Sequence, residues 1–360
     1  MIAAVAATSA AALLAAPAAL LLGHRALGRA RNASRMAITT PNGVDEQGFV
    51  RIGGIEQWIS VRGEDRANPV LLELHGGPGA STAIFGARTR SWERHFTVVR
   101  WDMRGTLKTL GRNGPEGTGE LSFERLYADA VEVTDHVRAR LGVDKVVLLG
   151  HSYGSALGLR LARAFPERYS AYVGTDQNIH DGGRDDSVHR ALLARLRAAG
   201  KRRELAAVEA LHPDERRWTA RERATHAKLL ATSDPLTLDT MKRTVMGSLW
   251  LSPRHSLREL RLFLRGMSLS EPVAQGTAGY DDWADGTDFA LPFFVFQGEK
   301  DVLTSPELAR RFFDDVRAPV KGFALIEECS HFAAFRRPER FLELLLTHVR
   351  PVATRASAHA

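Results

Sequence analysis

The stretch KVVLLGHSYGS, residues 145–155, decides the fold, because it predicts a buried strand that breaks directly into a helix with a serine at the break. Residues 146–149 form an unbroken apolar run, as expected for a parallel strand that is covered on both faces. Gly150 and Gly154 hold the outer positions of a G-x-S-x-G pattern, in which the tight turn leaves no room for a Cβ atom. The pattern therefore predicts an exposed Ser152 side chain on a strained backbone.

Ser152 could instead serve only as the N-cap of the helix that follows it. A second glycine-rich loop bears on this choice, because the apolar run at residues 70–74 ends in the sequence HGGPG at residues 75–79. Such a loop after a strand leaves backbone N–H groups free to bind an anion, which is how an oxyanion hole is built. A plain Gly-Pro turn is the alternative interpretation of the same residues.

Two further candidate catalytic residues also follow predicted strands. Asp301 comes after the predicted strand FFVFQ at residues 293–297, and His331 comes after the apolar run at residues 323–326. Because the carboxyl ends of parallel strands meet at one edge of a sheet, we expect both side chains near Ser152. The chain order Ser, Asp, His is typical of a hydrolytic triad, in which Ser152 attacks, His331 takes its proton and Asp301 orients the imidazole.

The oxyanion hole of such a site is predicted from the same two loops. The backbone N–H of Tyr153, together with that of Gly76 or Gly77, would bind the oxyanion. Asp176 is the alternative acid, because it follows the predicted strand at residues 169–173 and some proteins of this architecture carry the acid there.

The order of strand and helix patterns predicts the architecture. The patterns alternate up to about residue 177, give way to arginine-rich helical segments, and resume near residue 286. We expect an α/β protein whose mostly parallel central sheet carries helices on both faces, with an inserted helical cap. The predicted units are a hydrophobic segment with a basic flank (1–36), the first part of the core (40–177), the cap (178–285), the second part of the core (286–350) and a frayed tail (351–360).

The composition restricts the partners that we expect. The chain has 360 residues, a formal net charge of +7 and an isoelectric point near 9.8, with its arginines spread along the sequence. No basic stripe is interleaved with aromatic residues, so we expect no nucleic-acid partner. Cys329 is the only cysteine, which excludes an internal disulfide, and no cysteine-histidine spacing predicts a metal site. We expect neither a metal nor a cofactor.

The amino-terminal segment resembles a membrane anchor. Residues 2–22 are uncharged and rich in alanine, and a helix of this length would span roughly the ~30 Å hydrocarbon core of a bilayer. Arginines follow at positions 25, 29, 31 and 35, which favours a cytoplasmic location for the catalytic domain. We therefore expect membrane association through residues 2–22. A cleaved signal on a secreted protein, and an overlong gene start with initiation at Met36, are the alternatives.

Five motifs together resemble the prolyl aminopeptidase branch of the α/β-hydrolase family. They are HGGPG at 75–79, WDMRG at 101–105, GHSYGS at 150–155, GEKD at 298–301 and SHF at 330–332. The resemblance covers roughly residues 40–350 and implies an α/β-hydrolase fold without metal or cofactor. It also implies release of N-terminal residues, often proline, from short peptides. Carboxylates of the cap would then bind the substrate's α-ammonium group, and the candidates are Glu204, Glu209, Glu215 and Glu222.

One loop departs from the pattern of that family. The family usually continues as D-Q-R-G-x-G-x-S, whereas residues 102–109 read DMRGTLKT. An esterase, amidase or lactonase that acts on a small metabolite is therefore the alternative function. A further alternative is a scaffold that binds a ligand or partner without catalysis, although a pure binder has no need of Ser152, Asp301 and His331 together.

Overall fold

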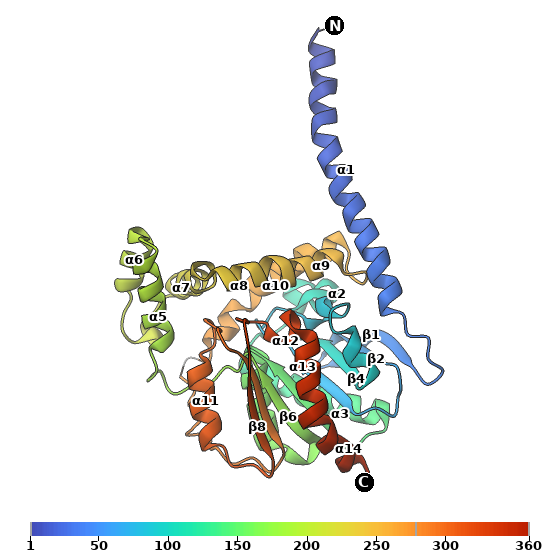
Figure 1. Ribbon diagram of the computed structural model, residues 1–360, viewed down its shortest axis with the longest axis vertical. Helices are drawn as coiled ribbons and strands as arrows, with labels where there is room; N and C mark the ends of the chain where they lie inside the picture. Colours follow the sequence, from blue (N-terminus) through green and yellow to red (C-terminus); the bar gives the residue numbers. More distant parts are fainter. Residues whose placement is uncertain (1, 278, 359–360) are drawn as a thin grey trace.

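The computed structural model describes residues 2–277 and 279–358, which are built around one eight-stranded sheet (Figure 1). The strand order is β1-β2-β4-β3-β5-β6-β7-β8. β2 pairs antiparallel with β1 and with β4, and all other pairs are parallel, so the predicted mostly parallel sheet is confirmed. The strands are β1 (Val44–Ile52), β2 (Ile55–Gly63), β3 (Val70–Leu74), β4 (Thr97–Asp102), β5 (Val146–His151), β6 (Tyr169–Thr175), β7 (Phe293–Gly298) and β8 (Lys321–Ile326).

Helices connect the strands and extend the chain at both ends. The helices are α1 (Ile2–Met36), α2 (Leu107–Gly117), α3 (Phe123–Leu141), α4 (Tyr153–Ala164), α5 (Ser187–Ala198), α6 (Arg202–Glu209), α7 (Ala220–Ser233), α8 (Pro235–Asp239), α9 (Gly247–Leu251), α10 (Leu257–Gln275), α11 (Pro306–Asp315), α12 (Ala333–Arg336), α13 (Pro338–Leu344) and α14 (Arg350–Ala358). The tail that we predicted to be frayed is thus helical through Ala358, and Ala353 within it is buried.

Each face of the sheet carries its own apolar cluster. Leu148 of β5 packs with residues of α3, α4 and α11, whereas its neighbours Val147 and Leu149 pack with residues of α12 to α14 on the other face. This follows from the alternation of side chains along a strand, and it explains why a strand covered on both faces is apolar without interruption. The predicted helices on both faces are confirmed.

Helices α5 to α10, which we call the helical insertion, lie between β6 and β7 in the chain. Figure 1 shows α8, α9 and α10 lying across one end of the sheet. The backbone of α10 touches the glycine-rich loop after β3, because a Cβ atom on Gly79 would lie 2.4 Å from the carbonyl oxygen of Gly266. The insertion therefore covers the edge at which the parallel strands end.

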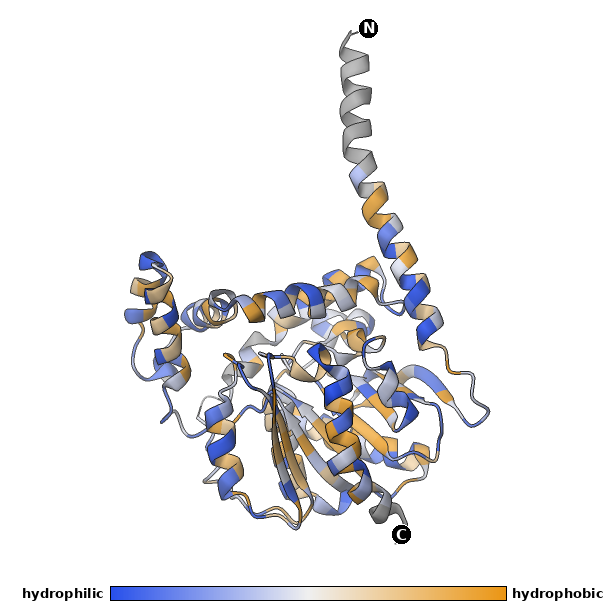
Figure 2. Ribbon diagram, viewed as in Figure 1, coloured by the Kyte–Doolittle hydropathy of each residue, from blue (hydrophilic) through white to orange (hydrophobic). Residues whose placement is uncertain are grey.

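The predicted membrane anchor is wrong, and so is the membrane-associated location that we inferred from it. Within the described residues, no helix is long and apolar enough to cross a membrane. The side chains of residues 1–16 and of residue 18 lie outside the description, and along the rest of α1 Figure 2 shows hydrophobic and hydrophilic residues interleaved. Two arginines of the basic flank, Arg25 and Arg29, donate hydrogen bonds to backbone carbonyls of the helical insertion.

Candidate active site

Ser152 lies on a sharp turn between β5 and α4. Its backbone has φ 51° and ψ −120°, a left-handed conformation that is uncommon for a residue with a side chain. Ser152 occupies the N-cap position of α4, yet its side chain makes no capping hydrogen bond. The hydroxyl is therefore not used for capping, and this contradicts the interpretation of Ser152 as a helix cap alone.

Close backbone contacts require the glycines around this turn. A Cβ atom on Gly154 would lie 2.2 Å from the carbonyl oxygen of Leu74, and one on Gly150 would lie 2.6 Å from the carbonyl oxygen of Gly154. Real Cβ atoms essentially never approach other atoms so closely, since this is well inside van der Waals contact. These glycines thus allow β3, β5 and α4 to meet at Ser152.

The candidate oxyanion loop lies against the same turn. A Cβ atom on Gly76 would lie 2.9 Å from Cβ of Ser152 and 3.5 Å from its Oγ. Gly77 has φ 111°, which only glycine adopts without strain. Tyr153 is the first residue of α4, so its N–H has no acceptor within the helix. The structure therefore brings Gly76 into contact with Ser152, next to the Tyr153 N–H, which has no acceptor within α4.

His75 holds this loop in place through two hydrogen bonds of its imidazole ring. Its Nε2 accepts a hydrogen bond from the Met103 N–H at 3.1 Å, so Nδ1 carries the proton and donates to the Gly76 carbonyl at 3.0 Å. Burial lowers the pKa of His75 to about 4, which keeps the ring neutral. We did not predict this role, and the only signal for it was that His75 opens the HGGPG sequence.

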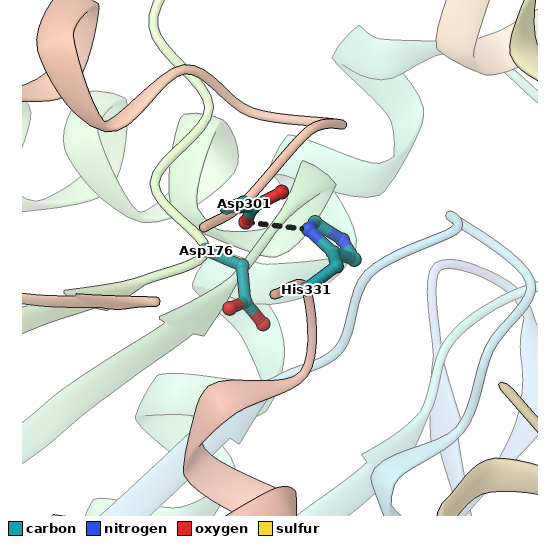
Figure 3. Close-up of side chains that lie close together, drawn as sticks. All are labelled: Asp176, Asp301 and His331. Carbon is teal, nitrogen blue, oxygen red and sulfur yellow. Dashed lines mark hydrogen bonds and ion pairs between the residues drawn. The ribbon is translucent and has the colours of Figure 1, made fainter. Parts of the chain in front are cut away.

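His331 and Asp301 form a buried pair (Figure 3). Nδ1 of His331 donates to Oδ2 of Asp301 at 2.8 Å. The same carboxylate accepts the Thr304 hydroxyl at 2.8 Å and the Leu303 N–H at 2.8 Å, so its orientation is fixed. A histidine oriented in this way by a carboxylate can accept a proton at its other nitrogen.

Asp176 lies beside this pair as a second buried carboxylate. Its two oxygens accept the backbone N–H groups of Phe332 and Ala333 at 3.1 and 3.3 Å, directly after His331. Burial raises the pKa of Asp176 to about 6. Burial by itself would lower the pKa of His331, but the charges of Asp301 and Asp176 outweigh that effect and raise it to about 9.

A chain of hydrogen bonds links Ser152 to the loop of His331. The Ser152 N–H donates to the carbonyl of Thr175 at 3.1 Å, and the next residue, Asp176, binds the His331 loop as described above. Among the described residues, the Ser152 hydroxyl itself has no hydrogen bond to His331. Catalytic hydrogen bonds are often long until substrate is bound, so this geometry remains compatible with proton transfer.

The four glutamates predicted to bind an α-ammonium group have different surroundings. Glu209 pairs with Arg197 at 2.6 Å, and Glu222 forms the capping box of α7 with Thr219. Glu204 lies in the first turn of α6, and Glu215 begins the short helix Glu215–Arg217. Of the four, Glu215 interacts electrostatically with His180 and Asp181, which follow β6 on the same segment as Asp176.

A metal ion is chemically conceivable among the buried residues of Figure 3. Asp176, Asp301 and His331 each offer a ligand atom, and these atoms lie within 4.8 Å of one another. However, N–H and O–H donors already bind the oxygens of both carboxylates, and Asp301 binds His331 directly. The donor set therefore fits a hydrogen-bonded acid-histidine pair better than an ion site.

Two surface cavities lie elsewhere. One of about 380 Å³ is lined by residues of α3 and α4 with Asp285, and one of about 560 Å³ lies between β1, α2 and α10. Neither is lined by Ser152, His331 or Asp301.

Known proteins resemble this chain in both sequence and fold. A sequence model described as the alpha/beta hydrolase family matches residues 70–344. A probable aminopeptidase of Bacillus subtilis is 21% identical over 304 residues, which cover 83% of this chain and 94% of that protein. A proline iminopeptidase of Thermoplasma volcanium is 31% identical over 128 residues, 36% of this chain and 40% of that protein.

A solved structure extends the likeness to the fold. The proline iminopeptidase-related protein of Thermus thermophilus has a TM-score of 0.57 and 23% identity, and the match covers 86% of this chain and 99% of that one. These matches confirm the resemblance that the five motifs indicate.

The contact at Gly154 gives the first prediction. Gly154→Ala should lower the free energy of unfolding by about 1–3 kcal/mol, because its Cβ would overlap the backbone of β3. Denaturant unfolding measures this change. Gly48→Ala in β1 is the control, since no atom lies within 4 Å of its Cβ position. Equal stability of the two variants would contradict the close approach at the turn.

Proposed function

This chain belongs to the alpha/beta hydrolase family, and from that premise we propose that it is a serine hydrolase that releases N-terminal residues from short peptides. The observation that carries the proposal is the buried His331-Asp301 hydrogen bond, linked through β6 to the strained turn of Ser152. The aminopeptidase relatives support the choice of peptide substrates.

The proposed reaction has two steps. Ser152 Oγ attacks the scissile carbonyl while Nε2 of His331 takes its proton, and the backbone N–H groups of Tyr153 and of Gly76 or Gly77 bind the oxyanion. His331 then gives the proton to the leaving amine as the C–N bond breaks, which leaves an acyl-enzyme. His331 then deprotonates a water molecule that attacks the acyl ester, and it returns the proton to Ser152 Oγ as the C–O bond breaks, which releases the N-terminal residue and restores the free enzyme.

We assign the two carboxylates different roles. Asp301 is the acid of the triad, because it accepts the hydrogen bond from Nδ1 of His331. Asp176 binds two backbone N–H groups instead, so it holds the loop and adds negative charge beside the imidazole. Asp301 and Asp176 together stabilise the imidazolium that forms when Ser152 loses its proton.

An esterase acting on a small metabolite is the second candidate function. Two of the four candidate glutamates are engaged in other contacts, and the loop at residues 102–109 departs from the aminopeptidase pattern. Of the other two, we propose Glu215 as the glutamate that binds an α-ammonium group in an aminopeptidase, because it interacts electrostatically with His180 and Asp181, which follow Asp176 in the chain.

The triad gives the second prediction. A fluorophosphonate probe should label the wild-type protein and fail to label Ser152→Ala, because the probe reacts with an activated serine. His331→Ala should lower turnover by at least ~10³-fold, and Asp301→Asn by ~10⁴-fold. Near wild-type turnover of His331→Ala would refute the triad, while folded wild-type protein without labelling would favour a non-catalytic scaffold.

The third prediction concerns pH. The proposed base works in its neutral form, so kcat/KM should rise with pH as His331 loses its proton. Asp176→Asn removes a charge that raises the pKa of His331, so the midpoint of this rise should move to lower pH. A pH–rate profile of the two proteins measures the shift. An unchanged midpoint would show that Asp176 carries no charge that the imidazole senses.

The substrate gives the fourth prediction. Prolyl arylamide should be cleaved, and N-acetylation should reduce its cleavage by ~10²-fold or more, because a carboxylate would lose its charged partner. Glu215→Gln should cause a similar loss on the free arylamide while sparing a p-nitrophenyl ester, and Glu209→Gln is the matched control. Equal rates on free and acetylated substrate, or cleavage of the ester alone, would exclude the aminopeptidase and favour the esterase.

A further inference from the structure

Six consecutive backbone carbonyls, from Trp250 to His255, accept hydrogen bonds from side chains of α1 and α2. The pairs are Arg25 Nη1 to Trp250 O at 3.1 Å, Asn32 Nδ2 to Leu251 O at 3.0 Å, Arg29 Nη1 to Ser252 O at 2.8 Å, Arg29 Nη2 to Pro253 O at 2.9 Å, Lys108 Nζ to Arg254 O at 3.1 Å and Arg25 Nη2 to His255 O at 2.9 Å. α9 ends at Leu251, and the last carbonyls of a helix have no partner within it. α1 therefore caps the end of α9 through Arg25 and Asn32, and Arg29 binds the carbonyls that follow this helix.

One face of α1 is shaped for this contact. Arg25, Gly28, Arg29 and Asn32 are spaced three and four residues apart, so they lie along one side of the helix. Arg25 is only 5% exposed, and its guanidinium lies 5.0 Å from the centre of the Trp250 ring. A Cβ atom on Gly28 would lie 2.6 Å from Cδ2 of Leu251, so a glycine allows the close approach.

The other arginines of α1 differ from this pair. Arg31 and Arg35 are exposed, and among the described residues neither makes a hydrogen bond or an ion pair. They carry the same charge on the same helix, but among the described residues no hydrogen bond or ion pair joins them to the helical insertion. This difference provides a matched control within α1.

The capped turn leads directly into α10. Ser256 is the N-cap of α10 and forms a capping box with Glu259, which also pairs with Lys108. Ten residues after that cap, the carbonyl of Gly266 lies against Gly79, at the end of the HGGPG loop. Contacts with α1 and α2 therefore fix the start of α10, and the middle of α10 contacts the HGGPG loop, which in turn contacts Ser152.

We propose that Arg25, Arg29 and Asn32 are positioning residues for the active site, which fix the 250–255 turn and thereby set α10 against the HGGPG loop. This inference rests on the proposed hydrolase function. Oxyanion donors act only at hydrogen-bond distance, and a displacement of about 1 Å can cost a factor of about 10² in rate. Loss of the α1 contacts should therefore lower the reaction rate at Ser152, although none of these residues touches the substrate.

The test compares two double variants of the full-length chain, which is the fifth prediction. Arg25→Ala/Arg29→Ala should lower kcat on a p-nitrophenyl ester, and the rate of fluorophosphonate labelling, by about 10-fold or more with a smaller change in KM, because the oxyanion contacts act in the transition state. Arg31→Ala/Arg35→Ala should leave both rates unchanged. Amide hydrogen exchange should quicken over residues 257–275 and 75–79 in the first variant only.

Two further variants keep the result interpretable. Arg25→Lys/Arg29→Lys retains both charges with fewer donors and should recover part of the lost kcat. Asn32→Ala removes a single hydrogen bond, and it should quicken exchange in the first turn of α10 even if the double alanine variant does not fold. Wild-type kinetics and exchange in the folded double alanine variant would overturn the proposal. An inactive, unlabelled wild type would instead refute the hydrolase function, and exchange in α10 would still test the link to α1.

Discussion

Hydrogen bonds at the end of β6 connect the turn that carries Ser152 to the loop that carries His331. The carbonyl of Thr175 accepts the Ser152 N–H, and the carboxylate of Asp176 accepts the two N–H groups after His331. Because Thr175 and Asp176 are consecutive, one peptide unit connects the turn of Ser152, the proposed nucleophile, to the loop of His331, the proposed base. Asp176 adopts φ 49°, a strained value for a non-glycine residue that typically costs about 1–3 kcal/mol. The surrounding hydrogen bonds offset this cost.

The sequence was sufficient to predict the mostly parallel sheet and to place Ser152, Asp301 and His331 after three of its strands. Ser152 follows β5 and Asp301 follows β7, which are buried along their whole length, whereas His331 follows the partly exposed edge strand β8, whose residues 323–326 are nevertheless apolar. The role of Asp176 could not be predicted in the same way, because its partners are backbone groups 156 residues away. The pattern of side chains along a sequence does not indicate which backbone groups lack a partner in the regular secondary structure.

The contacts of the amino-terminal helix could not be predicted from the sequence either. An apolar run followed by arginines is typical of a membrane anchor, and also of a helix whose basic flank docks on protein. Only the folded arrangement places unpaired carbonyls opposite Arg25 and Arg29. Lys108 belongs to the loop that departs from the aminopeptidase pattern, and it contributes to the same turn. That departure therefore has a structural use here, whatever the substrate.

The docking of α1 also has a consequence for the order in which the protein is made. Arg25 and its acceptor Trp250 are separated by 225 positions, so α1 leaves the ribosome long before its partner exists. At a synthesis rate of roughly 5–20 residues per second, the arginines wait for roughly 10–45 seconds. During that interval α1 has no carbonyls to cap, and an isolated helix gains little stability in water. In the nascent chain, α1 can therefore dock only after α9 has been made, and the strands β7 and β8 that complete the sheet are synthesised later still.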